Sequence, residues 1–230
     1  MKKWIFLFLL SAVTKGIVAQ DRLVFSFEYP LQYELSYHHV FEEIQGPSIG
    51  LGLLTAPFDE WIIDDLEQNG TDEEIIRLLR ESTRRGIILN LGYRLEHEGF
   101  FLEPRYQWAH INAENSTLNV VLEFYELEDL IEVLELLGFQ SLLESPVTMR
   151  SQLHQFALRL GYNWDINEKW GLQFSAGGSI YLNSKASFDS RLSRIDEVRE
   201  LEEQLVRDLN NAYKTGAYFY TLSLGIYRRL

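Results

Sequence analysis

Long segments in which apolar and polar residues alternate constrain this chain more than any other feature. The clearest is Gly86–Glu96, where large apolar side chains hold the odd positions and Arg94 and Glu96 hold even ones. The same alternation recurs over 99–110, 152–165, 169–183 and 216–230. Because successive side chains of a strand point to opposite faces, each segment predicts a β-strand with one apolar and one polar face.

The length of these segments and the residues on each face favour a membrane setting. They run for ten to fifteen residues, whereas globular strands average about five or six and a tilted membrane strand needs about nine to eleven. One face carries Tyr, Trp and Leu, and the other carries Gly, Ser, Asn, Gln and charge. A narrow barrel interior holds small polar residues more easily than rows of aromatics. We therefore expect a barrel with its apolar face toward lipid, and a soluble barrel with an apolar interior is the alternative.

Aromatic residues gather at the ends of the predicted strands. Trp164 and Trp170 flank one short turn, and Tyr93 and Phe100 flank another. Trp108, Tyr218 and Tyr220 fall at the opposite strand ends. Two aromatic belts at the two membrane–water interfaces are typical of membrane barrels.

If both chain ends lie in the periplasm, the number of strands must be even. Counting back from the last segment then gives eight strands. The predicted strands are 22–29, 31–37, 46–58, 86–96, 99–112, 152–165, 169–183 and 216–230. The short turns at 97–98 and 166–168 then face the periplasm, and the long connections face outward. The predicted fold class is an all-β, antiparallel, up-and-down membrane barrel. Ten strands is the alternative count, because the first hairpin has the weakest pattern.

Three long connections, near 59–84, 117–144 and 189–212, are helical in pattern and largely acidic. Thr71 to Glu74 forms a capping box that begins a helix in the first. Leu205 and Leu209 continue a helical stripe in the third. We expect these amphipathic helices to bury their apolar stripes on one another and to form a cap over the outer end of the barrel.

Residues 1–19 have the pattern of an export signal. Lys2 and Lys3 precede an apolar run, Trp4 to Val13, of about ten residues, which is too short to span a bilayer as a helix. A buried N-terminal strand is the alternative interpretation. The predicted organisation is therefore a signal peptide over 1–19 and a barrel with helical loops over 20–230.

The charge of the exported chain limits its partners. Removing Lys2, Lys3 and Lys15 from 21 basic residues leaves 18 against 34 acidic ones, a net charge of −16. A surface this acidic argues against nucleic acid and against direct binding to anionic lipid headgroups. The chain has no cysteine, so neither a disulfide framework nor a lipid-anchoring cysteine is expected.

Two strand segments carry a resemblance to a known family. The run Gly161 to Leu172 and the terminal run Tyr220 to Tyr227 resemble small bacterial outer-membrane β-barrel proteins of the OmpA-like transmembrane or porin-family type. The resemblance implies the outer membrane of a Gram-negative bacterium. The chain departs from that family by ending on Leu230 instead of an aromatic residue, and by its long helical loops.

Five charged residues fall on the polar, inward face of the predicted strands. They are Arg94, Glu96, Glu103, Arg105 and Arg159. Because an unpaired charge in a narrow barrel costs several kcal/mol, we expect Glu103 to pair with Arg94 or Arg159. An eight-stranded barrel is just wide enough for its own side chains. The sequence thus predicts a lumen plugged by ion pairs, with a narrow channel for small solutes as the alternative.

The enzyme alternative is a membrane-embedded hydrolase, which needs a base such as histidine oriented by a carboxylate. His38 and His39 with Glu42 and Glu43 are the one candidate cluster, and a solvated strand end is its simpler interpretation. No catalytic residue, metal site or cofactor is predicted. The predicted function is that of a non-enzymatic outer-membrane surface protein. Its expected partners are membrane lipid and, through the acidic helices, a protein partner or a second copy.

Overall fold

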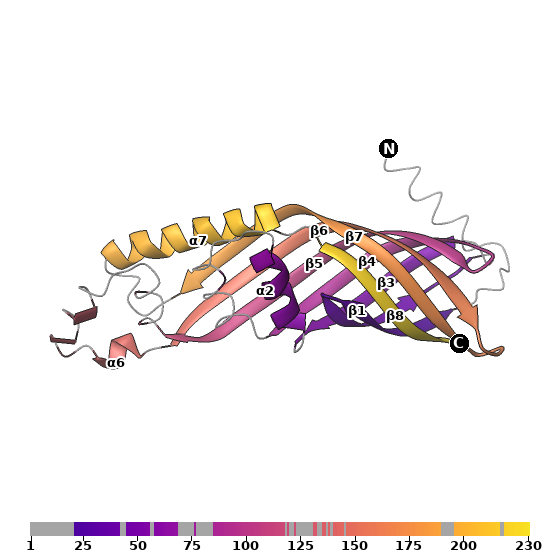
Figure 1. Ribbon diagram of the computed structural model, residues 1–230, viewed down its shortest axis with the longest axis horizontal. Helices are drawn as coiled ribbons and strands as arrows, with labels where there is room; N and C mark the ends of the chain where they lie inside the picture. Colours follow the sequence, from indigo (N-terminus) through magenta and orange to yellow (C-terminus); the bar gives the residue numbers. More distant parts are fainter. Residues whose placement is uncertain are drawn as a thin grey trace, which may run out of the picture.

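The computed structural model is a closed antiparallel barrel of eight strands in chain order, in which β8 pairs with β1 (Figure 1). The strands are β1 (Arg22–Tyr29), β2 (Gln32–His38), β3 (Gln45–Leu54), β4 (Arg85–His97), β5 (Phe100–Thr117), β6 (Pro146–Asp165), β7 (Trp170–Asp189) and β8 (Phe219–Arg229). The helices are α2 (Phe58–Gln68), α6 (Gln140–Leu143) and α7 (Asp196–Gly216). The predicted fold class and the count of eight strands are confirmed, and the ten-strand alternative is wrong.

The structure describes residues 21–41, 45–55, 58–68, 85–117, 140–144, 146–189, 196–216 and 219–230, with single positions at 76, 119, 122, 131, 132, 135, 136 and 138. The predicted signal peptide, the capping box at 71–74, Tyr218 and most of the predicted helix at 117–144 lie outside these residues. None of the described helices has both the length and the apolar character needed to cross a membrane.

The outer wall is apolar and the interior is polar. On β6, Phe156, Leu158 and Leu160 are 42%, 44% and 59% exposed, whereas Ala157 and Arg159 between them are buried. The other strands follow the same alternation, so the predicted facing is confirmed. Contiguous exposed apolar surface of this extent is unusual on a soluble monomer, and a polar interior inside an apolar wall is the arrangement of a membrane barrel.

The wall of the barrel is uneven in height. β1 and β2 have 8 and 7 residues, whereas β5, β6 and β7 have 18, 20 and 20. The three long strands continue past the barrel as a three-stranded sheet (Figure 1). The predicted strands therefore ended too early at 112 and 183 and began too late at 152. Beyond the apolar belt the outward positions become polar, for example Arg150 and Lys185, so the alternation in hydropathy fades while the strand continues.

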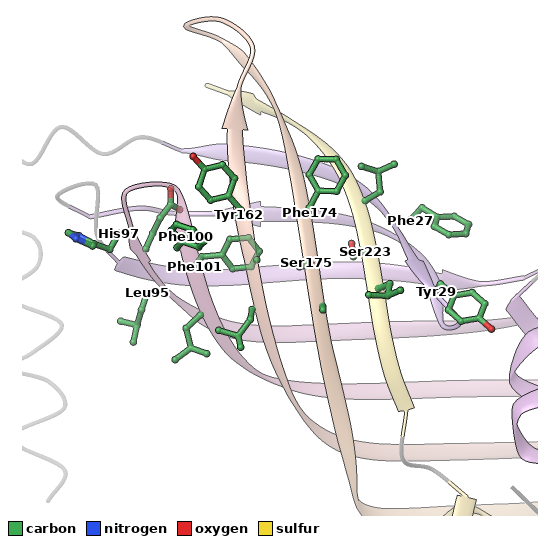
Figure 2. A pocket seen from close by; sticks show the side chains of 17 residues that line it. Phe27, Tyr29, Leu95, His97, Phe100, Phe101, Tyr162, Phe174, Ser175 and Ser223 are labelled. Carbon is green, nitrogen blue, oxygen red and sulfur yellow. The ribbon is translucent and has the colours of Figure 1, made fainter.

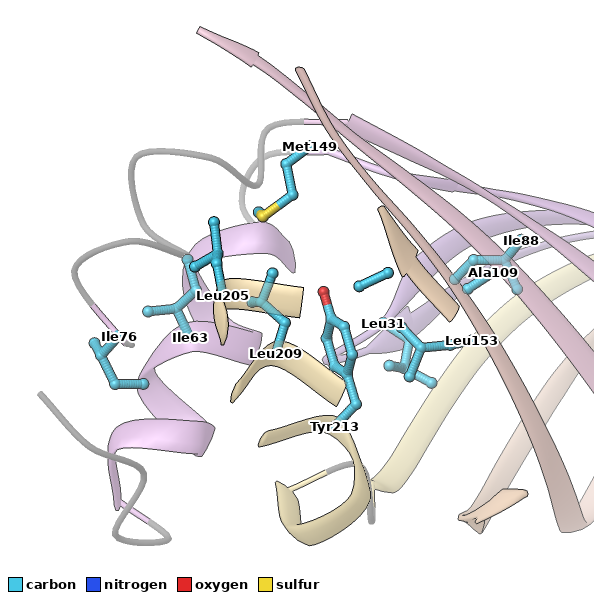
Figure 3. Packing of buried hydrophobic residues seen from close by; sticks show 11 residues of the cluster. Leu31, Ile63, Ile76, Ile88, Ala109, Met149, Leu153, Leu205, Leu209 and Tyr213 are labelled. Atoms are coloured by element: carbon cyan, nitrogen blue, oxygen red, sulfur yellow. The ribbon is translucent and has the colours of Figure 1, made fainter. Parts of the chain in front are cut away.

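Helix α7 covers the inward face of this sheet. Its stripe of Leu205, Leu209 and Tyr213 is buried against Met149 of β6 and Ala186 of β7 (Figure 3). The expectation that the helices would bury their stripes mainly on one another is corrected, because the extended strands present an apolar face that helix α7 covers.

Polar contacts hold α7 in place on the sheet. The Asn210 side-chain oxygen accepts hydrogen bonds from Ser184 Oγ at 2.7 Å and from the Ala186 amide at 3.3 Å. The Tyr213 hydroxyl donates to Ser151 Oγ at 3.0 Å. These bonds fix the helix against β6 and β7 in one position along the strands.

Helix α2 covers the low part of the wall. The Trp61 ring lies 5.0 Å from the ring of Tyr29 and 6.0 Å from that of Phe27, both on the outer face of β1. Ile63 of the same helix joins the buried cluster with Leu31. The helix thus packs on both sides of the short β1–β2 rim.

Two predictions about this region were wrong. Leu31 was placed in an outward-facing strand, but it lies in the β1–β2 turn, where its amide donates to the Glu28 carbonyl at 2.8 Å and its side chain is buried under the cap. The third strand was extended to Phe58, but β3 ends at Leu54 and Phe58 begins α2. Because β1 and β2 are short, the turn between them lies under the cap, and the apolar side chain of Leu31 points inward to pack there.

Candidate functional site

The lumen holds a dense set of charged side chains with equal numbers of each sign. Among the described residues, four arginines and four glutamates are buried in it. They are Arg22, Arg94, Arg105, Arg159, Glu28, Glu34, Glu96 and Glu103. Because β-strand alternation directs all of them inward and the barrel is closed, they have only one another and neutral polar groups as partners.

Two arginines reach across the full width of the barrel. Arg105 of β5 donates from Nη2 to Glu28 of β1 and from Nη1 to Glu34 of β2, the latter at 3.1 Å. Arg159 of β6 lies 3.3 Å from Glu34 Oε2. In a ring of eight strands, β1 faces β5 and β2 faces β6. These ion pairs therefore span the lumen instead of running along its wall.

Glu103 joins several strands. It accepts hydrogen bonds from Arg94 Nη2 at 2.7 Å and Nε at 3.1 Å, and from Ser48 Oγ at 2.8 Å. The Arg94 guanidinium also donates to Gln173 at 2.9 Å and lies 3.9 Å from the centroid of the Phe101 ring. Both Arg94 donors meet the same oxygen, Oε2, while Ser48 binds Oε1, so each oxygen of the Glu103 carboxylate has a partner.

The register of the β4–β5 hairpin differs from the sequence prediction. The turn residues are Glu98 and Gly99, with φ of 50° and 86°, instead of 97–98. Leu95 therefore pairs with Leu102, and Gly92 pairs with Arg105 instead of Glu103. The predicted pairing of β4 with β5 was shifted by two residues. Because side chains alternate between faces every two residues, this shift left every side chain on its predicted face.

The end of the lumen beside the β4–β5 turn has its own ion pair. Arg22 of β1 donates to both carboxylate oxygens of Glu96 of β4 at 2.8 Å. The Arg22 guanidinium also lies 5.4 Å from the centroid of the Tyr227 ring on β8. Three strands thus meet across this opening.

Glycines on the inner face of β3 make room for the network. A Cβ at Gly50 would lie 2.3 Å from Glu34 Oε1, and one at Gly52 would lie 1.6 Å from Gln32 Oε1. Gln32 in turn donates to Glu28 at 2.7 Å. Side chains from β1 and β2 therefore fill the space that larger residues on β3 would occupy.

All five lumen residues that the sequence singled out are buried in the lumen. Arg94, Glu103, Arg105 and Arg159 share one network of ion pairs, whereas Glu96 pairs with Arg22 at one end. Sequence reasoning missed Arg22, Glu28 and Glu34. The inward positions of the first hairpin carried the signal for Glu28 and Glu34, since both alternate with outward aromatics and leucines. Their closeness to Arg105 and Arg159 could not be read from the sequence because it depends on closure of the barrel.

The histidine cluster considered for catalysis is divided between two environments. His38 is buried in the lumen with its Nε2 2.9 Å from Ser36 Oγ. His39, just after the end of β2, has its Nδ1 2.5 Å from Asp21 Oδ1. His38 was expected at a solvated strand end, and its burial corrects that. Glu42 and Glu43 lie outside the described residues. Within the described part, no three His, Asp or Glu side chains gather as a metal site would require.

The predicted aromatic belt residues lie on the outer wall. Tyr93, Phe100, Trp164 and Trp170 are exposed near the short β4–β5 and β6–β7 turns. Toward the other end, Tyr220 is exposed and Trp108 is partly exposed. Phe100 packs edge-on against Tyr162 with centroids 4.8 Å apart.

A groove on the described barrel is formed mainly by outward-facing residues. It has a volume of about 1340 Å³ and is lined mainly by apolar side chains of the lipid-facing positions, including Leu95, Phe100, Tyr162 and Phe174 (Figure 2). Ala176 leaves the wall shallow between larger neighbours. A groove of this composition on a membrane barrel is suited to lipid chains, and it is not a site for polar chemistry.

Comparisons with known proteins give similarity of fold only. No protein-family model matches the sequence, and no curated protein matches it. CarO of Acinetobacter baumannii is 10% identical in sequence, with a TM-score of 0.37, and the match covers 92% of this chain and 97% of that one. The N-terminal β-barrel domain of Pseudomonas aeruginosa OprF is 9% identical, with a TM-score of 0.40, and the match covers 92% of this chain and 96% of that one. A major outer membrane protein of Thermus thermophilus is 10% identical, with a TM-score of 0.47, and the match covers 93% of this chain and 100% of that one. At these values the similarities carry no assignment of function to this chain.

Proposed function

We propose that this chain is an outer-membrane barrel of a Gram-negative bacterium with a closed lumen, and that it acts at the cell surface by contact instead of by catalysis or bulk transport. The continuous apolar outer wall, together with its exposed aromatic residues at both ends, supports membrane placement. The long connections between strands then face outward and the short turns face the periplasm.

The observation that carries the closed lumen is the pair of cross-lumen contacts made by Arg105 and Arg159 with Glu28 and Glu34. Above them, Leu31 and Leu153 meet helix α7 in the apolar cluster at the mouth (Figure 3). A solute would have to separate buried ion pairs and then the cap. Breaking a buried pair costs about 3–5 kcal/mol, which makes spontaneous opening rare.

Conductance of the purified protein in planar lipid bilayers tests this proposal. The native protein should insert without opening a conducting path. The double variant Arg105→Ala/Arg159→Ala removes both arginines that cross the lumen and should conduct. Heat-modifiable gel mobility shows whether each protein remains a closed barrel. Steady conductance by the native protein would contradict a closed lumen.

A narrow water-lined path is the second candidate, and one side of the lumen favours it. The hydroxyls of Ser175 and Ser179 on β7 and the amide of Asn163 on β6 are buried without a hydrogen-bond partner among protein groups. Buried polar groups of this kind are usually met by water. The same bilayer recordings decide between the two candidates, because a water-lined path would carry small ions in the native protein.

The surface contact is proposed for the cap. The chain carries an excess of acidic residues, and the described cap includes Leu136, which is 86% exposed. A protein partner or a second copy would cover such apolar positions. Sedimentation of the detergent-solubilised protein, with Leu136→Ser as the variant, tests self-association: the native protein should sediment as an oligomer and the variant as a monomer.

A further inference from the structure

Three buried polar side chains on the inner wall of β6 and β7 have hydrogen-bonding atoms that no protein group meets. Asn163 pairs in register with Gln173, and Ser175 follows two residues along β7. All three point into the lumen and are at most 8% exposed. Both amide atoms of Asn163, Nε2 of Gln173 and Oγ of Ser175 lack a partner among the described residues. Because buried polar groups are rarely left unpaired, the group indicates a bound species.

The orientation of the Gln173 amide makes its free atom a donor. The side-chain oxygen of Gln173 accepts a hydrogen bond from Arg94 Nη1 at 2.9 Å. A guanidinium group only donates, so the atom that meets it must be the oxygen, and Nε2 with its two N–H groups points elsewhere. Asn163 adds a second free amide and Ser175 a free hydroxyl. This surplus of donors favours an anion, which only accepts.

Two guanidinium groups flank the three side chains along β7. Arg94 contacts Gln173 at one end. At the other end, Arg159 Nη2 donates to Ser223 Oγ at 3.4 Å, and Ser223 is the register partner of Ser175 on the neighbouring strand (Figure 2). Nε and Nη1 of Arg159 make no hydrogen bond to a described protein group. An anion beside Gln173 and Ser175 would therefore lie between two positive charges.

The carboxylates around this group are already bound by arginines. The nearest in register and along the strands are Glu28, Glu96, Glu103 and Asp165, and they pair with Arg105, Arg22, Arg94 and Arg229 respectively. Glu34 pairs with Arg105 and Arg159. None of these carboxylates accepts a hydrogen bond from the free atoms of Asn163, Gln173 or Ser175. The free donors thus remain available to an anion.

Two aromatic rings enclose the group. A Cβ at Gly161, which pairs with Ser175, would overlap the ring of Phe101. A Cβ at Gly171, two residues before Gln173, would overlap the ring of Tyr227. The glycines therefore admit the rings, which shield the polar group from bulk water. In such a setting a hydrogen bond to an ion is stronger than in water.

We infer that Asn163, Gln173 and Ser175 bind one small monovalent anion of the size of chloride, between the guanidinium groups of Arg94 and Arg159. This inference goes beyond the proposed function, because it depends on the interior of the barrel and not on contact at the cell surface. A single ion held in this way leaves the cross-lumen pairs of Arg105 in place, so binding needs no open channel.

Bromide in place of chloride locates the site directly. The barrel is refolded in sodium bromide, so that the ion enters during folding, and is then crystallised in the same salt. An anomalous diffraction peak should lie within hydrogen-bonding distance of Gln173 Nε2 and Ser175 Oγ. Absence of a peak at these side chains would overturn the inference and leave water as their partner.

The affinity is measured in solution by urea unfolding of the vesicle-folded barrel over a series of chloride concentrations. Sodium gluconate keeps the ionic strength constant. A ligand that binds only the folded state stabilises it by an amount that rises with ligand concentration, so the series gives the Kd for chloride.

Two variants and a matched control test the residues. Gln173→Glu keeps the size of the side chain but adds a negative charge, and it should abolish the chloride dependence. Ser175→Ala removes one donor to the ion and should raise the Kd about 10-fold. Ser179→Ala is the control: its hydroxyl is also buried and unpaired on β7, four residues from Ser175, and the native Kd should persist.

Equal chloride dependence in the native protein, Gln173→Glu and Ser175→Ala would contradict the site, as would an equal loss in Ser179→Ala. Heat-modifiable mobility shows that each variant is a closed barrel. Bilayer conductance separates this inference from the proposed function. A non-conducting barrel without a bromide peak contradicts the anion site alone, whereas a conducting native barrel with the peak contradicts the closed lumen alone.

Discussion

Arg105 on β5 and Glu28 on β1 form a buried ion pair between residues 77 apart in the chain. Their strands are separated by three others in either direction around the closed ring. The inner width of the barrel is therefore small enough for two side chains on opposite strands to span it. An interior of eight strands is just wide enough for side chains to fill.

The first prediction concerns this pair. Glu28→Gln should lower the free energy of unfolding by about 3–5 kcal/mol, because Arg105 loses its carboxylate and Arg159, 4.0 Å away, loses part of its compensation. Urea unfolding of the barrel folded in lipid vesicles, followed by tryptophan fluorescence, measures the change.

The double variant Glu28→Gln/Arg105→Gln is the control for that measurement. It removes both charges together, so its destabilisation should be clearly smaller than the sum for the two single variants. Simple additivity would mean that the two side chains are not coupled across the lumen.

A second prediction tests the outer wall with one substitution at two exposed leucines. Leu91, on the outer face of β4, is 45% exposed, and Leu136, in the cap, is 86% exposed. Leu91→Arg should cost about 2–4 kcal/mol near the bilayer midplane. Leu136→Arg should change stability by no more than about 0.5 kcal/mol. Similar small effects on vesicle-folded protein would show that the wall around Leu91 does not contact lipid.

The third prediction separates the cap from the barrel. Leu209 is buried at the centre of the α7 stripe, and Leu209→Ala should destabilise the cap by about 2–5 kcal/mol. Trypsin should then cleave faster after Arg207, while the barrel keeps its heat-modifiable mobility and stays non-conducting. Gln204→Ala, at an exposed position of the same helix, should leave cleavage unchanged. Conductance by Leu209→Ala would mean that the cap alone closes the passage.

The fourth prediction concerns pH and the cap. Burial raises the pKa of the Tyr213 hydroxyl above its usual value, so the folded cap favours the neutral phenol. This contribution to stability is present below a pH of about 10, the ordinary tyrosine pKa, and is lost as the pH rises toward the raised value. The helical circular-dichroism signal should therefore fall in strongly alkaline solution.

Tyr213→Phe is the comparison for the alkaline transition. It lacks the ionisable group, so the part of the alkaline loss due to this residue should disappear. The variant also loses the hydrogen bond to Ser151 and should be about 0.5–1.5 kcal/mol less stable near neutral pH. An unchanged alkaline transition would show that Tyr213 does not couple the cap to pH.

The local patterns predicted which residues face the lumen and missed where strands end. The two-residue repeat placed Arg94, Glu103 and Arg159 inside, and they remain inside in the observed β4–β5 register. The position of the β4–β5 turn was missed by one residue, although Gly99, with a φ of 86°, is the residue type that such a turn favours. The ends of β6 and β7 were missed because strands leaving the membrane no longer alternate in hydropathy.

By itself, the sequence determined the strand-rich class, the apolar exterior and the polar interior, because these follow from a repeat that each strand carries within its own residues. Only the tertiary structure decided that Arg105 meets Glu28 and that Leu31 turns inward beneath α7. These contacts join residues far apart in the chain. They depend on register, closure and strand height, which the packing of the whole barrel sets and no single segment encodes.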